Sequence, residues 1–186
     1  MKDKIILRVP TLDDREKAEE YKKEHFDAGE KVIYGSDLWD QMEDYGEWLA
    51  MVTKNSSQTT VNPDWVVTDT YLAIREGDEK MVGIIDFRHT LNEFLRDFGH
   101  IGYSVRPEER RKGYASEMLS KVLERAWEKG FDRVQLSCHA VNMASAKTIE
   151  KNGGQKVRTF QYEGQKADIY EITRNGYEQN RDGKEK

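Results

Sequence analysis

The stretch VRPEERRKGYA (105–115) decides how this sequence is interpreted. Four of its eleven residues are cationic, although the formal net charge of the chain is -5. From its last residue onward, apolar residues recur at the spacing of one helix face, namely Ala115, Met118, Leu119, Val122, Leu123, Ala126 and Trp127. We therefore predict a helix that begins near Ala115 and ends before Gly130, with a cationic segment containing a glycine in front of it.

The start of such a helix is suited to binding an anion. The first backbone N–H groups of a helix have no partner within it, and its N-terminus carries a partial positive charge. Both features favour phosphate. Gly113 lets the backbone approach a ligand closely, and Arg110, Arg111 and Lys112 add positive charge. The stretch therefore predicts a site for one phosphate-bearing cofactor.

Length and composition narrow the classes of protein that fit. A chain of 186 residues is long enough for one domain with a proper core, and 35% charged residues of both signs indicate a heavily charged surface. The negative net charge argues against binding a nucleic-acid backbone. No apolar run approaches the ~20 residues of a membrane span, and MKDKIILRVP (1–10) does not resemble a signal peptide. Cys138 is alone, so neither an internal disulfide nor a cysteine-based metal site is expected. We expect a cytoplasmic protein without a metal, a membrane or a nucleic-acid partner.

Periodicity and turn residues predict an α/β order of elements. Helices are expected from Thr11 onward and over 45–54 and 143–154, and strands over 5–10, 68–76, 81–89, 100–107, 131–140, 156–163 and 167–173. The strand–helix–strand order in the middle predicts a parallel strand pair, whereas the hairpins predict antiparallel neighbours. We expect one domain over residues 1–174 and a polar, frayed tail over 175–186.

The spacing of glycines and cations distinguishes between kinds of phosphate site. The stretch is neither GxxxxGK[ST] nor GxGxxG. Its pattern is Arg-x-x-Gly-x-Ala (110–115), which resembles the acetyl-CoA pyrophosphate loop of the GNAT superfamily of N-acetyltransferases. Further along, VNMASAKTIEKNGG (141–154) resembles the second signature of that superfamily, an asparagine followed by a small residue, a short helix and a glycine. The order of elements also resembles that fold from residue 5 to about residue 173.

The resemblance implies a mixed, mostly antiparallel central sheet with a splayed parallel strand pair and flanking helices. It also implies that acetyl-CoA is the co-substrate, held by backbone amides of the loop, by the preceding strand and by the region after the asparagine. The cofactor-binding residues implied in this way are Tyr103, Ser104, Val105, Arg110, Arg111, Lys112, Gly113, Tyr114, Ala115, Ser116, Asn142 and Lys147. Asn142 is equally suited to cap the helix that follows it, and Lys147 to be a solvated helix lysine.

The same resemblance implies direct acetyl transfer to a primary amine of a small molecule or a peptide. His100 at the start of the splayed strand and Asp86 on the preceding strand are the candidate bases, and the ordinary pKa of histidine suits proton transfer near neutrality. A backbone N–H near Gly102 or Tyr103 would stabilise the carbonyl oxygen. A surface histidine and a structural carboxylate are the alternative interpretations.

The sequence departs from the superfamily at the proton donor. Many members carry a tyrosine seven residues after the asparagine, and Ile149 stands there in this chain. This leaves room for a second hypothesis, a non-catalytic acyl-CoA-binding or sensing module. Cys138 alternates with Leu136 and Val134, which favours a core position over a nucleophile.

The resemblance also implies that the early helical region lines the acceptor side. DLWDQMEDYGEW (37–48) holds five carboxylates, which would favour a cationic amine if they lined the site and would otherwise form a solvated face. Trp39, Tyr45 and Trp48 would either line the acceptor site or belong to the core. A monomer and a homodimer are both compatible with the sequence.

Overall fold

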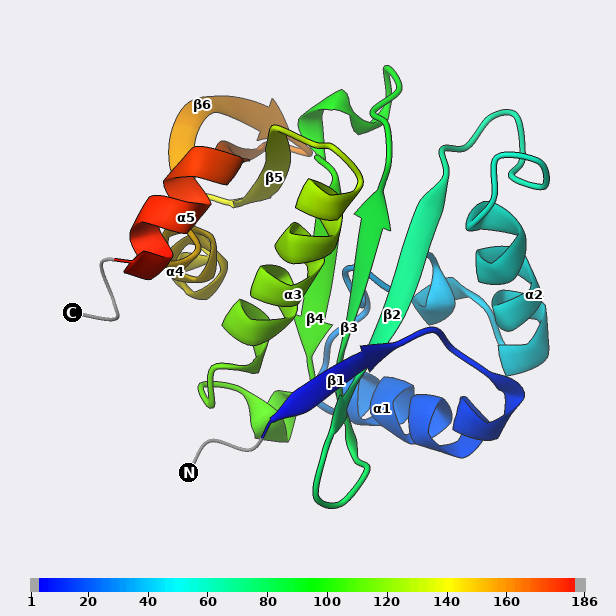
Figure 1. The fold of residues 1–186 in the computed structure, drawn as a ribbon. Helices are drawn as coiled ribbons and strands as arrows, with labels where there is room; N and C mark the ends of the chain where they lie inside the picture. The colour runs from blue at the N-terminus through cyan, green and yellow to red at the C-terminus, as the bar shows by residue number, and fades with distance from the viewer. Residues whose placement is uncertain (1–3, 183–186) are drawn as a thin grey trace.

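Two antiparallel sheets form the centre of the protein, which a computed structural model describes over residues 4–182 (Figure 1). The larger sheet has the order β1-β2-β3-β4, formed by Ile5–Arg8, Thr68–Arg75, Met81–Arg88 and Ile101–Val105. The smaller sheet has the order β5-β7-β6, formed by Arg133–His139, Gln165–Thr173 and Gln155–Tyr162. The mixed α/β architecture is as predicted, and the hairpins β2–β3 and β6–β7 fall where the turn residues indicate.

The helices flank these sheets. They are α1 (Arg15–Asp27), α2 (Tyr45–Asn55), α3 (Tyr114–Glu128), α4 (Met143–Lys151) and α5 (Arg174–Asp182). The first begins after one 3-10 turn, in which the buried Asp14 accepts hydrogen bonds of 2.9 Å from both the N–H and the hydroxyl of Thr11. This local capping explains why the start of the helix can be predicted from the sequence.

Each face of the larger sheet packs against different helices. Because side chains alternate along a strand, Ile85 and Phe87 face the core under α3, whereas Ile84 faces a second core under α1 and α2. Trp39, Tyr45 and Trp48 all belong to this second core and are at most 1% exposed. The suggestion that these three aromatic side chains line the acceptor site is therefore wrong.

The two sheets separate between β4 and β5. Over the part of the chain that the structure describes, one isolated bridge joins Gly99 to Leu136, next to a 2.7 Å hydrogen bond from the His100 N–H to the Gln135 carbonyl oxygen. A Cβ at Gly99, whose φ is +86°, would lie 2.5 Å from that same oxygen, so only glycine permits the contact. Beyond this point β4 continues along β3, and β5 along β7. Among the described residues no ladder joins β4 to β5, so the two strands of the predicted pair are splayed.

The C-terminal segment is ordered further than the sequence indicates. Residues 174–182 form α5, so the prediction of a frayed tail is wrong for 175–182, and 183–186 lie outside the described residues. Tyr177 is buried against α3, and its hydroxyl lies 2.7 Å from the Ser120 Oγ. Within residues 4–182 no helix has the length and apolarity needed to cross a bilayer.

Candidate functional site

The start of α3 is built by two residues with left-handed backbone. Arg111 has φ +65° and Gly113 has φ +87°, and together they turn the chain from the strand end into the helix. The Glu117 N–H donates to the Gly113 carbonyl at 3.2 Å, so the amides before Glu117 form the open first turn. Tyr114 is buried in the core under α3, which anchors the first residue of the helix.

Two of the three predicted loop cations are paired with carboxylates. The Arg110 guanidinium donates to both oxygens of Glu30 at 2.5 and 2.8 Å, and its Nε donates to the Val105 carbonyl at 3.1 Å. Lys112 donates to Glu109 at 2.7 Å. Arg111 is exposed. The positive character of the loop therefore comes mainly from backbone amides and Arg111, and less from its net side-chain charge than the sequence indicates.

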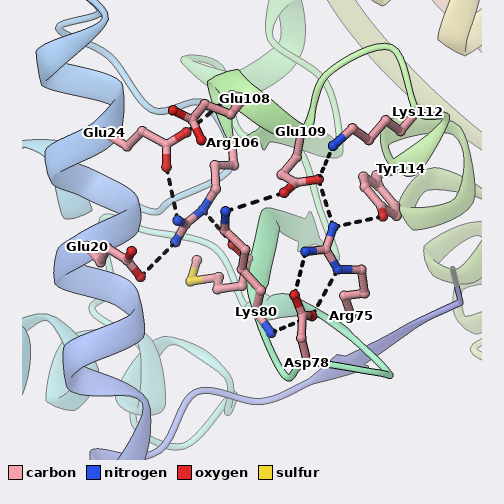
Figure 2. A network of polar contacts seen from close by, with 11 residues as sticks. Glu20, Glu24, Arg75, Asp78, Lys80, Arg106, Glu108, Glu109, Lys112 and Tyr114 are labelled. Carbon is pink, nitrogen blue, oxygen red and sulfur yellow. Dashed lines mark hydrogen bonds and ion pairs between the residues drawn. The ribbon is translucent and has the colours of Figure 1, made fainter.

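Glu109 links the loop to the β2–β3 hairpin (Figure 2). This buried carboxylate forms ion pairs with Lys112 at 2.7 Å, with Arg75 at 2.8 Å and with Lys80 at 3.4 Å. Burial opposes its ionisation, but the hydrogen bonds from Lys112 and Arg75 outweigh burial and lower the pKa of Glu109 to about 2. Arg75 also donates to the Tyr114 hydroxyl at 3.3 Å. The first residue of α3 is thus fixed to the hairpin.

Arg106 fixes the other end of the loop. It is almost fully buried, and its Nε donates to the Met81 carbonyl at 2.8 Å. Its Nη1 donates to Glu24 at 3.0 Å and its Nη2 approaches Glu20 at 3.4 Å, both on α1 (Figure 2). A buried guanidinium needs such partners, since an unpaired charge in the interior is costly. The loop is therefore held in shape before any ligand binds.

The outer edge of β4 carries backbone groups that point toward the gap between the sheets. Hydrogen bonds from the Arg106 N–H to the Val82 carbonyl (2.9 Å) and from the Gly102 N–H to the Asp86 Oδ1 (2.6 Å) show which groups of β4 face β3. Because orientation alternates along an antiparallel strand, the N–H and C=O of Tyr103 point the other way. Of the two amides expected to stabilise an oxyanion, that of Tyr103 is the one on the gap side.

The two candidate bases, Asp86 and His100, both accept hydrogen bonds from neighbouring groups. Asp86 is completely buried; its Oδ2 accepts from Arg88 at 2.7 Å, and burial raises its pKa. The His100 Nδ1 accepts from the Gln135 N–H at 3.0 Å, and burial lowers its pKa. The imidazole is therefore neutral, with its lone pair engaged and its proton on Nε2. His100 fastens β5 to β4, and Arg88 also donates to the Gly99 carbonyl at 3.0 Å.

Two hydroxyl groups in contact lie near Ile149, the residue that stands where many superfamily members carry a tyrosine. The Tyr103 hydroxyl is 2.9 Å from the Ser145 Oγ, one turn before the buried Ile149 on α4. Burial raises the pKa of Tyr103. Ser145 itself is positioned by its N–H, which donates to the capping Asn142 Oδ1 at 3.1 Å. Pattern reading misses this pair because its members lie 42 residues apart.

The remaining predicted residues have simpler surroundings. Asn142 caps α4 and is exposed, and Lys147 is exposed on the same helix. The Ser104 hydroxyl donates to the Tyr34 carbonyl at 2.8 Å, so its side chain holds the segment after α1. Cys138 is half-buried against the α3 core, and burial raises its thiol pKa, as a core position implies. No grouping of His, Cys, Asp or Glu side chains within 4–182 is suited to hold a metal ion.

Comparison with known proteins identifies the family. The acetyltransferase (GNAT) domain profile matches residues 4–155, so this chain belongs to the GNAT acetyltransferase family. A curated relative, the uncharacterized N-acetyltransferase YoaA of Bacillus subtilis (strain 168), is 31% identical over 93 residues, which is 48% of this chain and 51% of the relative. The match thus spans about half the length of that relative.

Solved structures share the fold at low sequence identity. RimL, a ribosomal alpha-N-protein acetyltransferase in complex with coenzyme A, superposes with a TM-score of 0.67 at 16% identity, covering 91% of this chain and 93% of RimL. A chimera of the Vibrio cholerae spermidine N-acetyltransferase SpeG gives 0.65 at 14% identity over 94% and 98%. A GNAT-family acetyltransferase from Bacillus anthracis gives 0.62 at 19% identity over 93% and 96%.

Proposed function

We propose that this protein is an acetyl-CoA-dependent N-acetyltransferase that transfers the acetyl group directly to a primary amine. One observation carries the proposal: β4 ends at Val105 and leads through the loop into the open first turn of α3, and within residues 4–182 no strand forms a ladder with the outer edge of β4. An anion site and an unpaired strand edge in succession match a ligand with a pyrophosphate and an amide-containing arm. Family membership and the likeness to a coenzyme A complex support this interpretation.

The residues present fit this co-substrate. The amides of residues 111–116 and the Arg111 side chain would hold the pyrophosphate. Backbone groups of Tyr103 and Val105 would pair with the pantetheine arm as an added strand does. Asn142 and Lys147, exposed on α4, would contact the arm and the nucleotide phosphates. Acetyl-CoA supplies the activated acetyl group.

The chain's own groups would then assist the transfer. The Tyr103 N–H faces the gap and would stabilise the carbonyl oxygen as negative charge develops. The hydroxyl pair of Tyr103 and Ser145 would donate a proton to the leaving thiolate, in place of the tyrosine that Ile149 replaces. Neither predicted base has a lone pair left for the acceptor, because the His100 Nδ1 accepts from Gln135 and both oxygens of the buried Asp86 accept hydrogen bonds from Arg88 and Gly102.

Only the chemical class of the acceptor amine is proposed. One structural neighbour acts on spermidine and another on a ribosomal protein, so both a small polyamine and a peptide amine are represented among proteins of this fold. Of the five carboxylates over 37–48, Asp44 caps α2 and pairs with Arg15, whereas Asp37 interacts with Asp86 and Arg88 of β3, so Asp37 is the one that favours a cationic acceptor. We therefore propose a primary amine on a cationic small molecule or peptide.

The test is release of free thiol from acetyl-CoA in the presence of polyamines, amino acids, aminoglycosides and N-terminal peptides. Release with one class would establish the activity and the acceptor. Binding of acetyl-CoA in a thermal-shift assay without release from any acceptor would favour the binding module instead. Arg111→Ala should raise the KM for acetyl-CoA, whereas Arg133→Ala, an exposed arginine on β5, serves as the matched control.

A further inference from the structure

The segment between α1 and α2 lies against the middle of β4. A Cβ placed on Gly35 would be 2.3 Å from the Gly102 carbonyl oxygen, so the two backbones are in close contact. The hydrogen bond from the Ser104 hydroxyl to the Tyr34 carbonyl, at 2.8 Å, fixes the same contact. Gly102 and Asp86 form a register pair, so the contact lies directly beside the buried carboxylate. Asp37 follows only two residues after Gly35.

Asp37 is held in an unusual conformation. It has φ +50° and Leu38 has φ +68°, so two successive residues with side chains adopt left-handed backbone. Such conformations are unfavourable and gather at functional sites. Trp48 of α2 holds the segment in place, because its Nε1 donates to the Ser36 carbonyl at 2.7 Å. Contacts with the rest of the protein therefore hold Asp37 in this conformation.

The carboxylate of Asp37 has one hydrogen-bond partner among the described residues. The Asn55 Nδ2 of α2 donates to its Oδ2 at 3.2 Å. From β3, Asp86 repels its negative charge and Arg88 attracts it. Burial is the largest influence, and with Asp86 it raises the pKa of Asp37 to about 6. Asp86 is fully buried and bonded at both oxygens, whereas Asp37 remains partly exposed.

The surroundings on the solvent side suit a cation. Tyr34 is 55% exposed, and burial together with the charge of Glu163 in the β6–β7 turn raises its pKa. Tyr162, beside that turn, packs edge-to-face on Phe98 with ring centroids 5.0 Å apart. Aromatic faces next to carboxylates attract an ammonium group. This aromatic and acidic surface is joined to β4 through the hydrogen bond from Ser104 to the Tyr34 carbonyl.

We propose that Asp37 is the residue that binds the acceptor ammonium and accepts its proton. The inference rests on the proposed acetyltransferase function. The Asp37 carboxylate first takes one proton from the ammonium, which frees the nitrogen lone pair to form the bond to the acetyl carbon. As the carbon–sulfur bond breaks, the nitrogen loses its second proton, which passes through the hydroxyl pair of Tyr103 and Ser145 to the departing thiolate. Asp37 then returns its proton to solvent. Asp86 is then a positioning residue that holds Gly102 and raises the basicity of Asp37.

The test compares Asp37→Asn with wild type under the thiol-release assay, with acetyl-CoA affinity measured in parallel. We expect kcat to fall about 100-fold or more at pH 7.5, as for loss of a general base, with acetyl-CoA affinity unchanged. The wild-type rate should fall below an apparent pKa near 6, and this acidic limb should be absent in the variant. Asp69→Asn removes another partly buried, ion-paired aspartate and should keep its activity.

A readout without turnover accompanies this assay. Because the pKa of Asp37 is raised on folding, its ionisation weakens stability as pH rises from about 4 to about 6. Asp37→Asn should therefore melt at a higher temperature than wild type at pH 7.5, and the difference should disappear near pH 4. Asn55→Ala removes a hydrogen bond that lowers this pKa, so the acidic limb should move to higher pH.

The outcomes separate the inference from the function on which it rests. Turnover by Asp37→Asn within about threefold of wild type, with the acidic limb intact, would overturn the role of Asp37 and leave the enzyme established. An acidic limb that stays in place in Asn55→Ala would overturn it as well. If wild type binds acetyl-CoA but acetylates no amine, the proposed function itself fails, and the role of Asp37 fails with it.

Discussion

Replacing Gly35 with alanine tests the contact between the α1–α2 segment and β4. The residue has φ +77°, a conformation that costs an L-residue roughly 1–2 kcal/mol. The added Cβ would lie 2.3 Å from the Gly102 carbonyl oxygen and 2.8 Å from the Tyr103 Cα. Neither is the movable end of a side chain, so the segment itself must shift.

The size of the effect follows from what that shift breaks. Moving the segment away from β4 disrupts the Trp48 Nε1 to Ser36 carbonyl bond (2.7 Å) and the Ser104 hydroxyl to Tyr34 carbonyl bond (2.8 Å). Each is worth about 1 kcal/mol net. With the backbone cost, we expect Gly35→Ala to lower the free energy of unfolding by about 3–4 kcal/mol.

Urea denaturation of wild type and variants at pH 7.5 measures this difference. Gly130→Ala is the matched control, because Gly130 has φ +87° but no atom within 4 Å of an added Cβ, and it should cost only the conformational part of roughly 1–2 kcal/mol. Equal losses for the two variants would refute the close approach of the segment to β4. Gly35→Ala should also bind acetyl-CoA while transferring acetyl poorly, because Asp37 moves with the segment.

Three further predictions concern the rest of the chain. Glu30→Gln should destabilise the protein by less than about 1 kcal/mol near neutral pH, since its ion pair with Arg110 is partly exposed. The hydrogen bond from Arg110 lowers the pKa of Glu30, so this contribution is present above the unfolded pKa of about 4.3. The loss should shrink as urea titrations are taken to lower pH, and a loss that does not change with pH would contradict the pairing. Tyr177→Ala should cost about 2–4 kcal/mol in the same assay, because the ring is buried and its hydroxyl bonds Ser120; a change within error would mean that α5 is not docked. Cys138 should react at pH 7.5 at least about tenfold more slowly with a thiol reagent than free cysteine, because burial raises its pKa and limits access; reaction at the free rate would place the thiol on the surface.

Much of the fold follows from local sequence patterns. The apolar spacing after Ala115 predicts α3, Thr11 and Asp14 predict the start of the first helix, and Gly164 predicts the last turn. Each of these signals acts over a few residues, through hydrogen bonds and side-chain periods that neighbours in the chain decide. The loop at 110–115 and its placement before a helix are predictable for the same reason.

The composition of the candidate site could be predicted only in part. The sequence indicates cations at Arg110 and Lys112, but their neutralisation by Glu30 and Glu109 depends on which elements pack together. The expected tail becomes α5 because Tyr177 finds an apolar surface on α3 that no local pattern reveals. The hydroxyl pair of Tyr103 and Ser145 has no sequence signature either.

By itself, the sequence determined the elements, the glycine-led start of α3 and the family resemblance, because these depend on spacings of a few residues. Only the tertiary structure decided that β4 and β5 meet at one point, where the backbone at Gly99 touches that of Gln135. It also decided that Asp37 stands beside Asp86, 49 positions away in the chain. Burial and the proximity of like charges set the pKa of a carboxylate, and both arise only when distant segments pack.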